Sequence, residues 1–147
     1  MKRVFAAAVL LLAMTACGGS QKKALSLEGT LWKLSEMKGI PATAIDAEAD
    51  FFTLQFNPAD TMVSGRTNCN RFFGRYVVKD SQLTFENMGM TRMACPDMAY
   101  EEAFVQMLNG VDRYAVEGKE LKLYGEDRPL ATFRAVEEPA SSAPAAK

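Results

Sequence analysis

The chain has 147 residues with 17 basic and 18 acidic side chains, which corresponds to about one globular domain. With 48% hydrophobic and 24% charged residues, it is too apolar for a disordered chain and too evenly charged for a dedicated nucleic-acid binder. It contains no histidine, which excludes a histidine-based triad, an imidazole metal site and an imidazole pH switch built from this chain alone.

The N-terminus has the layout of a secretory signal. Two basic residues precede an apolar run at residues 4–14, and a pair of small residues follows before Cys17. Eleven helical residues reach roughly 16 Å, about half of a hydrocarbon core, so a permanent spanning helix is disfavoured. The residues before Cys17 resemble a lipobox, where the cysteine is lipidated and the chain is cut. We expect a signal peptide at 1–16 and a lipidated tether at 17–26; an ordinary signal peptide with an incidental cysteine is the alternative.

Cleavage before Cys17 would leave 15 of the 17 basic residues against 18 acidic ones. A net acidic chain is repelled by anionic lipid and by nucleic acid, so we expect acyl chains to provide the membrane attachment and nucleic acid to be no partner. This predicts a membrane-anchored lipoprotein of the bacterial cell envelope. Gly18 carries no obvious retention signal, which favours the outer membrane, facing the periplasm.

Lipidation of Cys17 leaves Cys69 and Cys95 as an even pair in an oxidising compartment. A disulfide between them is therefore expected, and it would close a loop of about 27 residues. Two free buried thiols and a reactive redox pair are the alternatives, the latter without Cys-x-x-Cys spacing.

Residues 27–136 carry nearly all of the aromatic and branched side chains and form the expected domain, whereas residues 137–147 have the composition of a disordered tail. Short segments of strand composition separated by turn residues predict an antiparallel sheet. Trp32 and Leu34 share one face of the first segment and are expected in the core. The predicted strands are 29–37, 50–56, 61–66, 72–79, 82–87, 111–116, 120–124 and 130–136.

One segment has helical periodicity. Apolar residues recur at three- and four-residue spacing from Tyr100 to Val111, and Asn109-Gly110 ends the run. Pro96 suits a first turn, and Asp97 offers a side chain able to cap free amides. The sequence therefore predicts one amphipathic helix of about thirteen residues, which begins beside Cys95. Glu101 and Glu102 lie early in it, where the helix dipole favours negative charge.

Three possible ligand sites have more ordinary explanations. The acidic residues at 46–50 open like a calcium loop but lack the required Gly and Glu further on, which favours a solvated loop. The basic and aromatic run at 71–76 can mark base stacking, but export and net negative charge argue against it. A methionine patch could hold Cu(I), but methionines more often fill irregular cores. That patch comprises Met88, Met90, Met93 and Met98. We expect no metal site, no cofactor and no catalytic residue.

Four sequence blocks in fixed order resemble the META/HslJ family of bacterial envelope lipoproteins. They begin with Leu27-x-Gly-Thr-x-Trp-x-Leu34, and the longest runs from Gly65 to Tyr76 around Cys69. Met90-Thr-Arg-Met-Ala-Cys-Pro96 and Glu101-x-x-Phe-x-x-x-Leu108 follow. The resemblance covers about 110 residues, essentially the whole folded region.

The resemblance implies an α+β fold that is mainly antiparallel β, a cracked or partial barrel of seven or eight strands packed with one helix. It is similar to pilotin lipoproteins, which shield lipids or peptides in an apolar crevice, and the family has no established catalytic activity. Associations of the family with heat shock and drug resistance point to envelope stress. Asn68 stands where many members have Gly, which implies a turn with positive φ.

These observations favour a non-enzymatic envelope lipoprotein that binds a peptide or an assembly partner, by strand addition or in a crevice beside the helix. A carrier of acyl chains in a barrel lumen is one alternative, and an enzyme or an inhibitor of an envelope hydrolase is another. Asn68, Asn70, Arg71 and Arg92 are candidates for a polar ligand rim. Turn hydrogen bonds by the asparagines and ion pairs by the arginines are the competing explanation.

Overall fold

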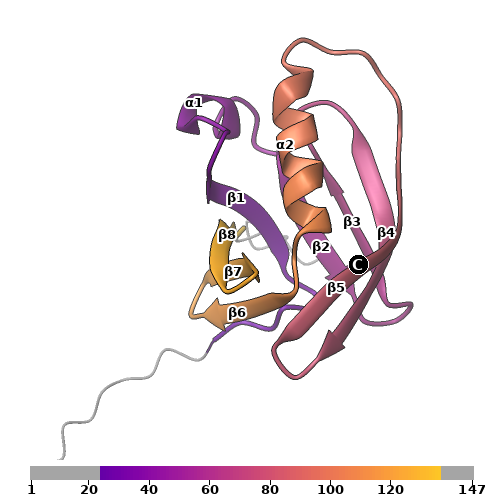
Figure 1. The fold of residues 1–147 in the computed structure, drawn as a ribbon, viewed down its shortest axis with the longest axis vertical. Helices are drawn as coiled ribbons and strands as arrows, with labels where there is room; N and C mark the ends of the chain where they lie inside the picture. The colour runs from indigo at the N-terminus through magenta and orange to yellow at the C-terminus, as the bar shows by residue number, and fades with distance from the viewer. Residues whose placement is uncertain (1–23, 137–147) are drawn as a thin grey trace, which may run out of the picture.

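The computed structural model describes residues 24–136, which form an antiparallel ring of strands with a helix across it (Figure 1). Each strand pairs with the next, and β8 returns to pair with β1. This confirms the predicted antiparallel partial barrel. The strands are β1 (Leu31–Met37), β2 (Thr53–Asn57), β3 (Met62–Arg66), β4 (Arg71–Lys79), β5 (Gln82–Met90), β6 (Arg113–Glu117), β7 (Glu120–Gly125) and β8 (Arg128–Ala135).

The barrel interior is filled by the inward-facing residues of the strands. Trp32 and Leu34 point inward from β1 as predicted, with exposed fractions of 0% and 2%, and Leu121 and Leu123 do the same from β7. The Trp32 indole donates a hydrogen bond to the Leu27 carbonyl at 2.9 Å, so its polar atom is satisfied inside the core. Large aromatic and leucine side chains therefore occupy the lumen.

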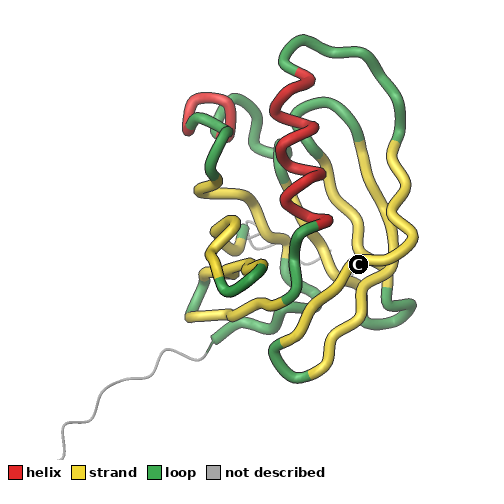
Figure 2. Tube along the Cα trace, viewed as in Figure 1, coloured by secondary structure: helices red, strands yellow, loops and turns green. Residues whose placement is uncertain are grey.

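The ring is weakest between β5 and β6. Their ladder consists of the single pair Gln82↔Arg113, whereas β4 and β5 pair along almost their whole length. Helix α2 (Met98–Asn109) lies across this gap (Figure 2). Its buried Phe104 ring packs against three other rings at centroid distances of 5.4 to 6.2 Å, those of Phe52, Phe72 and Phe133. The helix thus replaces the missing strand contacts with aromatic packing.

Two local features differ from the sequence expectations. A second, four-residue helix α1 (Ala42–Ile45) follows β1. Strand β5 continues three residues beyond Asn87, where the sequence predicted its end. Asn87 has a φ of 52°, and the register with β4 shifts beside it, so the residue forms a bulge that bends the strand without ending it.

The start of α2 also differs in detail. Asp97 is the N-cap residue, but its φ is 60° and its side chain makes no capping hydrogen bond. Its carbonyl oxygen instead accepts hydrogen bonds from the Tyr100 amide and the Asn68 side-chain amide, both at 3.1 Å. Pro96 precedes the cap rather than occupying the first turn.

Neither helix within residues 24–136 has the length and apolarity needed to cross a bilayer. The predicted signal peptide, Cys17, the first part of the tether and the 137–147 tail lie outside the described residues.

Candidate functional site

An apolar crevice opens between α2 and β5, beside the gap in the barrel. Its volume is about 280 Å³. Strand β5 contributes Met88, Gly89 and Met90, and the helix contributes Val105 and Leu108. The remaining lining residues are Phe72, Arg92 and Asn109. The space is slightly smaller than a typical small-molecule pocket, so it matches one or two apolar side chains of a partner.

The bulge in β5 shapes this crevice. Met88 lies next to it, and its sulfur occupies the space over Gly74, where any Cβ would lie only 2.3 Å away. Met90 is also partly buried against the core. Because methionine side chains are flexible and polarisable, they form an adaptable wall for apolar groups. Met93, by contrast, is 54% exposed, and neither Met93 nor Met98 lines the crevice.

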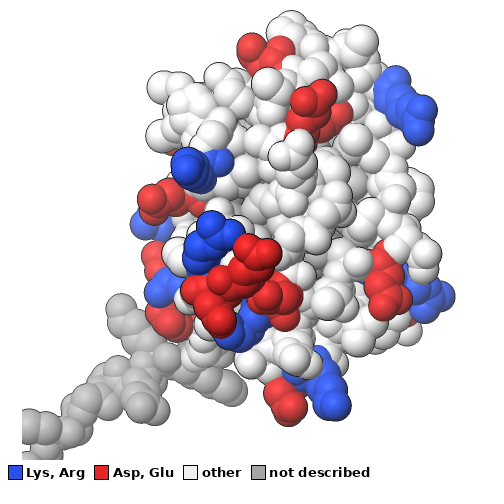
Figure 3. Space-filling view, viewed as in Figure 1, with Lys and Arg blue, Asp and Glu red and all other residues white. Residues whose placement is uncertain are grey.

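The rim of the crevice carries one cation. Arg92 is exposed, and its guanidinium makes no hydrogen bond or ion pair with the residues that the structure describes. Asn109, at the end of α2, is the other polar lining residue. Figure 3 shows a largely uncharged surface over α2 and β5, while mixed charges gather over β6 to β8. The site therefore combines an apolar floor with an available positive charge.

A buried polar cluster supports the start of α2. Glu101 is 2% exposed, and its carboxylate accepts hydrogen bonds from the Thr67 hydroxyl and from both the backbone and side-chain amides of Asn70, the latter two at 3.0 Å. The Asn70 side-chain oxygen accepts from the Thr91 hydroxyl at 2.8 Å and the Met93 amide at 2.7 Å. Asn70 therefore joins three segments of chain, and its polar atoms face protein rather than solvent.

The disulfide lies beside this cluster. Cys69 and Cys95 are bonded with their Cα atoms 6.0 Å apart, which confirms the expected pair. The bridge links the segment between β3 and β4 to the segment immediately before α2. Together with Asn70 and Glu101 it fixes the helix relative to the sheet, and thus the width of the crevice.

The four candidate rim residues do not form one site. Asn68 is half-buried; its amide nitrogen bonds the Asp97 carbonyl, and its Oδ1 is buried and accepts no hydrogen bond within residues 24–136. Asn68 is not among the described residues with positive φ, so the expectation of a left-handed turn there was wrong. Arg71 points outward from β4, and of the four only Arg92 lines the crevice.

The acidic loop at residues 46–50 is organised by a lysine. The Lys33 ammonium donates to the carbonyl oxygens of Ile45, Glu48 and Phe51 at 2.8, 2.7 and 3.1 Å. Its burial lowers the pKa of Lys33, while the nearby carboxylates act in the opposite direction. No group of three or more His, Cys, Asp or Glu side chains within residues 24–136 could hold a metal ion.

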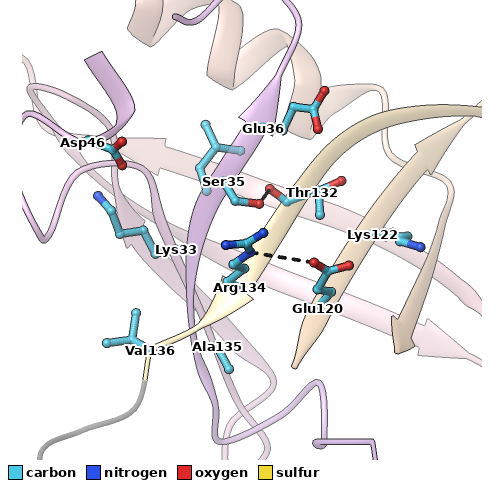
Figure 4. A pocket seen from close by; sticks show the side chains of 11 residues that line it. Lys33, Ser35, Glu36, Asp46, Glu120, Lys122, Thr132, Arg134, Ala135 and Val136 are labelled. Carbon is cyan, nitrogen blue, oxygen red and sulfur yellow. Dashed lines mark hydrogen bonds and ion pairs between the residues drawn. The ribbon is translucent and has the colours of Figure 1, made fainter. Parts of the chain in front are cut away.

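A polar pocket on the outside of β1, β7 and β8 is a weaker candidate (Figure 4). Arg134 reaches toward Glu120 at 3.7 Å, and the Ser35 hydroxyl donates to the Thr132 carbonyl at 3.0 Å. Lys33, at its edge, is occupied by the loop carbonyls. Four of the lining residues thus bind one another in two pairs, and Lys33 is engaged by the loop, which makes this pocket a weaker binding site than the crevice.

Of the crevice residues, the sequence indicated Arg92 as a rim candidate, and it indicated Met88 and Met90 only as members of a methionine patch. Val105 lies outside the stripe that marks the buried helix face, and the continuation of β5 past Asn87 was not predicted. Only the crossing of α2 over β5 brings these residues together, and one-dimensional periodicity carries no information on that crossing.

Comparisons with known proteins agree with the fold and cover most of the chain. The model of a family described as META domain matches residues 25–137. Heat shock protein HslJ of Escherichia coli is 27% identical over 137 residues, which are 91% of each chain. The NMR structure of a protein from Burkholderia xenovorans is 27% identical, with a TM-score of 0.62 over 76% of this chain and 85% of that one. A DUF4847 family protein from Bacteroides vulgatus shares the fold at 17% identity, with a TM-score of 0.53 over 74% of this chain and 93% of its own.

Proposed function

This chain belongs to the META domain family, and from that premise we propose that it is a non-enzymatic envelope lipoprotein that binds a partner protein through the crevice between α2 and β5. The partner inserts an apolar side chain between Met88 and Val105. Arg92 at the rim adds attraction for a neighbouring carboxylate of the partner. The name of the relative, a heat shock protein, supports a role in envelope stress.

The observation that carries this proposal is an open apolar crevice with an available cation beside a filled lumen. A carrier of acyl chains needs an interior cavity, but Trp32, Phe56 and Phe133 are fully buried within the barrel. The crevice is also small for a lipid tail, whereas partner side chains of ordinary size fit it. These facts favour partner binding over the lipid carrier. Nothing in the described residues singles out an inhibitory segment aimed at a hydrolase.

Site-specific photocrosslinking in whole cells tests the proposal. Val105 lines the crevice, while the neighbouring Gln106 is exposed and lies outside it. A benzophenone amino acid at position 105 should give a discrete adduct, and the same group at 106 should not. A second experiment places the crosslinker at position 109, which also lines the crevice. In that chain Val105→Glu should abolish the adduct. Gln106→Glu, which makes the same change in charge outside the crevice, should preserve it.

Equal adducts from positions 105 and 106 would indicate abundant bystanders and would contradict the proposal. The carrier alternative has its own readout. A stoichiometric fatty acid or phospholipid in the detergent-extracted protein, beyond any acyl group on Cys17, would favour it instead.

A further inference from the structure

Strand β4 presents an unusual outward face. Its inward residues Phe72, Gly74 and Tyr76 are buried, while Val78 near its end is 37% exposed. Its outward positions alternate cations with apolar side chains over about 26 Å. Phe73 is 52% exposed and Val77 is 48% exposed. The cations are Arg71, Arg75 and Lys79, all of them exposed.

The charges on this face are not paired with other described residues. Among residues 24–136, no hydrogen bond or ion pair involves the side chains of Arg71, Arg75 or Lys79. Basic residues of β6 to β8 are paired with acidic neighbours: Arg113 with Asp127, Lys122 with Glu117, Arg128 with Glu126 and Arg134 with Glu120. Three cations without an ion pair therefore lie in a row on β4, whereas Lys38 and Arg92, which also have none among the described residues, lie on other segments.

The neighbouring strands leave the face accessible. Ser64 and Thr84 stand opposite Phe73 and Val77, so small polar residues flank the apolar ones. Carboxylates also border the area: Asp50 is bound to Arg66, Glu86 lies in register with Arg75 without an ion pair, and the exposed Asp80 directly follows Lys79. The Phe73 ring packs over Gly89, where an added Cβ would lie 3.0 Å from the ring. This contact explains part of the orientation of Phe73. The contact with Gly89 does not explain why Phe73 remains about half exposed between two cations.

The chain enters the fold near the C-terminal end of β4, on its inward side. The Leu25 amide bonds the Gly118 carbonyl at 3.0 Å, and Leu25 lines the same surface depression as Val78 at the end of β4. A membrane anchor that precedes residue 24 would therefore hold this end of β4 close to a bilayer.

We infer that the outward face of β4 is a membrane-contact surface that docks on anionic phospholipid headgroups, with Phe73 and Val77 in the interfacial layer and the three cations beside lipid phosphates. Basic side chains close to an anionic surface are attracted to it, and aromatic rings favour the interface. Because the rest of the chain carries excess negative charge, an anionic membrane repels the other faces and attracts this one. The inference rests on the proposed membrane anchoring, but not on the crevice or on what binds there.

Tryptophan fluorescence can test this orientation. The native Trp32 is the single tryptophan of the chain and is fully buried, so a second one reports its own surroundings. The full chain with Phe73→Trp, or with Glu36→Trp on the outside of β1, is reconstituted into vesicles of phosphatidylcholine with or without phosphatidylglycerol. With the anionic lipid, Phe73→Trp emission should shift to the blue and be quenched by brominated lipid, whereas Glu36→Trp emission should do neither.

A charge control separates docking from mere proximity. Replacing Arg71 and Arg75 by Ser should lower the docked-to-undocked ratio about thirtyfold, and replacing Arg128 and Arg134, which removes the same charge from β8, should not lower it. Equal emission of the two reporters, equal quenching in neutral and anionic vesicles, or an equal blue shift on adding soluble polyglutamate would each overturn the inference. The last result would assign the face to an acidic polypeptide.

Discussion

Glu101 places a carboxyl group in the protein interior among neutral donors, and it forms no ion pair within residues 24–136. Three donors converge on its two oxygens, from Thr67 and twice from Asn70. Such an acceptor is costly to remove, because the donors cannot reach water once the disulfide and helix close over them. The arrangement makes Glu101 a link between α2 and the segment that leads into β4.

Replacing Glu101 by Ala should lower the free energy of unfolding by about 3 kcal/mol, since it leaves several buried donors unsatisfied. Glu102, the next residue, is exposed and provides a matched control; Glu102→Ala should change stability by less than about 0.5 kcal/mol. Urea unfolding of the oxidised proteins measures both. Equal effects of the two substitutions would show that the helix dipole, rather than the buried cluster, determines the role of Glu101.

Tyr76 should give the protein a distinct alkaline sensitivity. Its ring is buried, and its hydroxyl donates to a Glu28 oxygen at 2.5 Å. Burial first, and then the hydrogen bond and charge of Glu28, raise the pKa of Tyr76 well above its usual value near 10. The protonated form is thus favoured in the folded state. Its stabilising effect is complete below about pH 10 and is lost as pH rises toward the folded pKa.

We therefore expect the wild-type protein to lose up to about 1 kcal/mol of stability per pH unit above pH 10 through this group. Tyr76→Phe should remove that part of the slope, at a cost of about 1 kcal/mol near neutral pH for the lost hydrogen bond. Chemical denaturation from pH 7 to 11 measures both quantities, and lysine titration cancels in the difference. Parallel stability curves would rule out the shifted tyrosine.

Single residues were the least predictable part of the site. Asn70 and Glu101 are 31 positions apart, and no local pattern indicates that their side chains meet. Asn68 was expected in a left-handed turn, but the positive φ near this site belongs to Asp97, whose carbonyl Asn68 binds. The left-handed backbone at Asp97 and the asparagine that binds its carbonyl thus lie on different segments.

At the scale of elements, periodicity was informative wherever one face of an element is buried. Every predicted strand segment overlaps an observed strand, and α2 ends at Asn109 as the Asn-Gly pair indicated. The two features that the sequence did not predict, the full length of β5 and the helix α1, have local causes. Asn87 has the composition of a turn but occupies a bulge, and α1 is too short for a periodic signal and has its last carbonyl held by Lys33.

The disulfide should contribute strongly to stability, because it joins the segment before β4 to the segment before α2 and closes a loop of about 27 residues. The chain-entropy relation gives about 3.5 kcal/mol for a loop of this length. Replacing both Cys69 and Cys95 by Ser should lower the denaturant midpoint accordingly, and a reducing agent should shift the wild type but not the double variant. A free-thiol assay on denatured, unreduced protein that found both thiols would contradict the bridge.

At the scale of the whole molecule, the closing contacts are those that sequence patterns could not provide. Antiparallel strands followed from alternation, but the ring depends on β8 returning to β1 across about 100 residues. The resemblance to the family implied the barrel, and the structure adds where it is weak. The single pair between β5 and β6 leaves room for α2, so the crevice is a consequence of incomplete closure.

Attachment and orientation at the membrane should be separable properties of the molecule. Acyl chains contribute about 0.8 kcal/mol per buried methylene, whereas three cations near an anionic surface contribute about 3 kcal/mol together. The contribution of the three cations alone is weaker than a millimolar affinity.

A chain exported behind a signal that is cleaved without lipidation, so that it begins at Gly18, should therefore be soluble at physiological salt. Its thermal unfolding should be unchanged. The Arg71→Ser, Arg75→Ser variant of the native chain should remain in the membrane fraction. Membrane retention of the first protein, or release of the second, would reverse the assignment of anchor and contact surface.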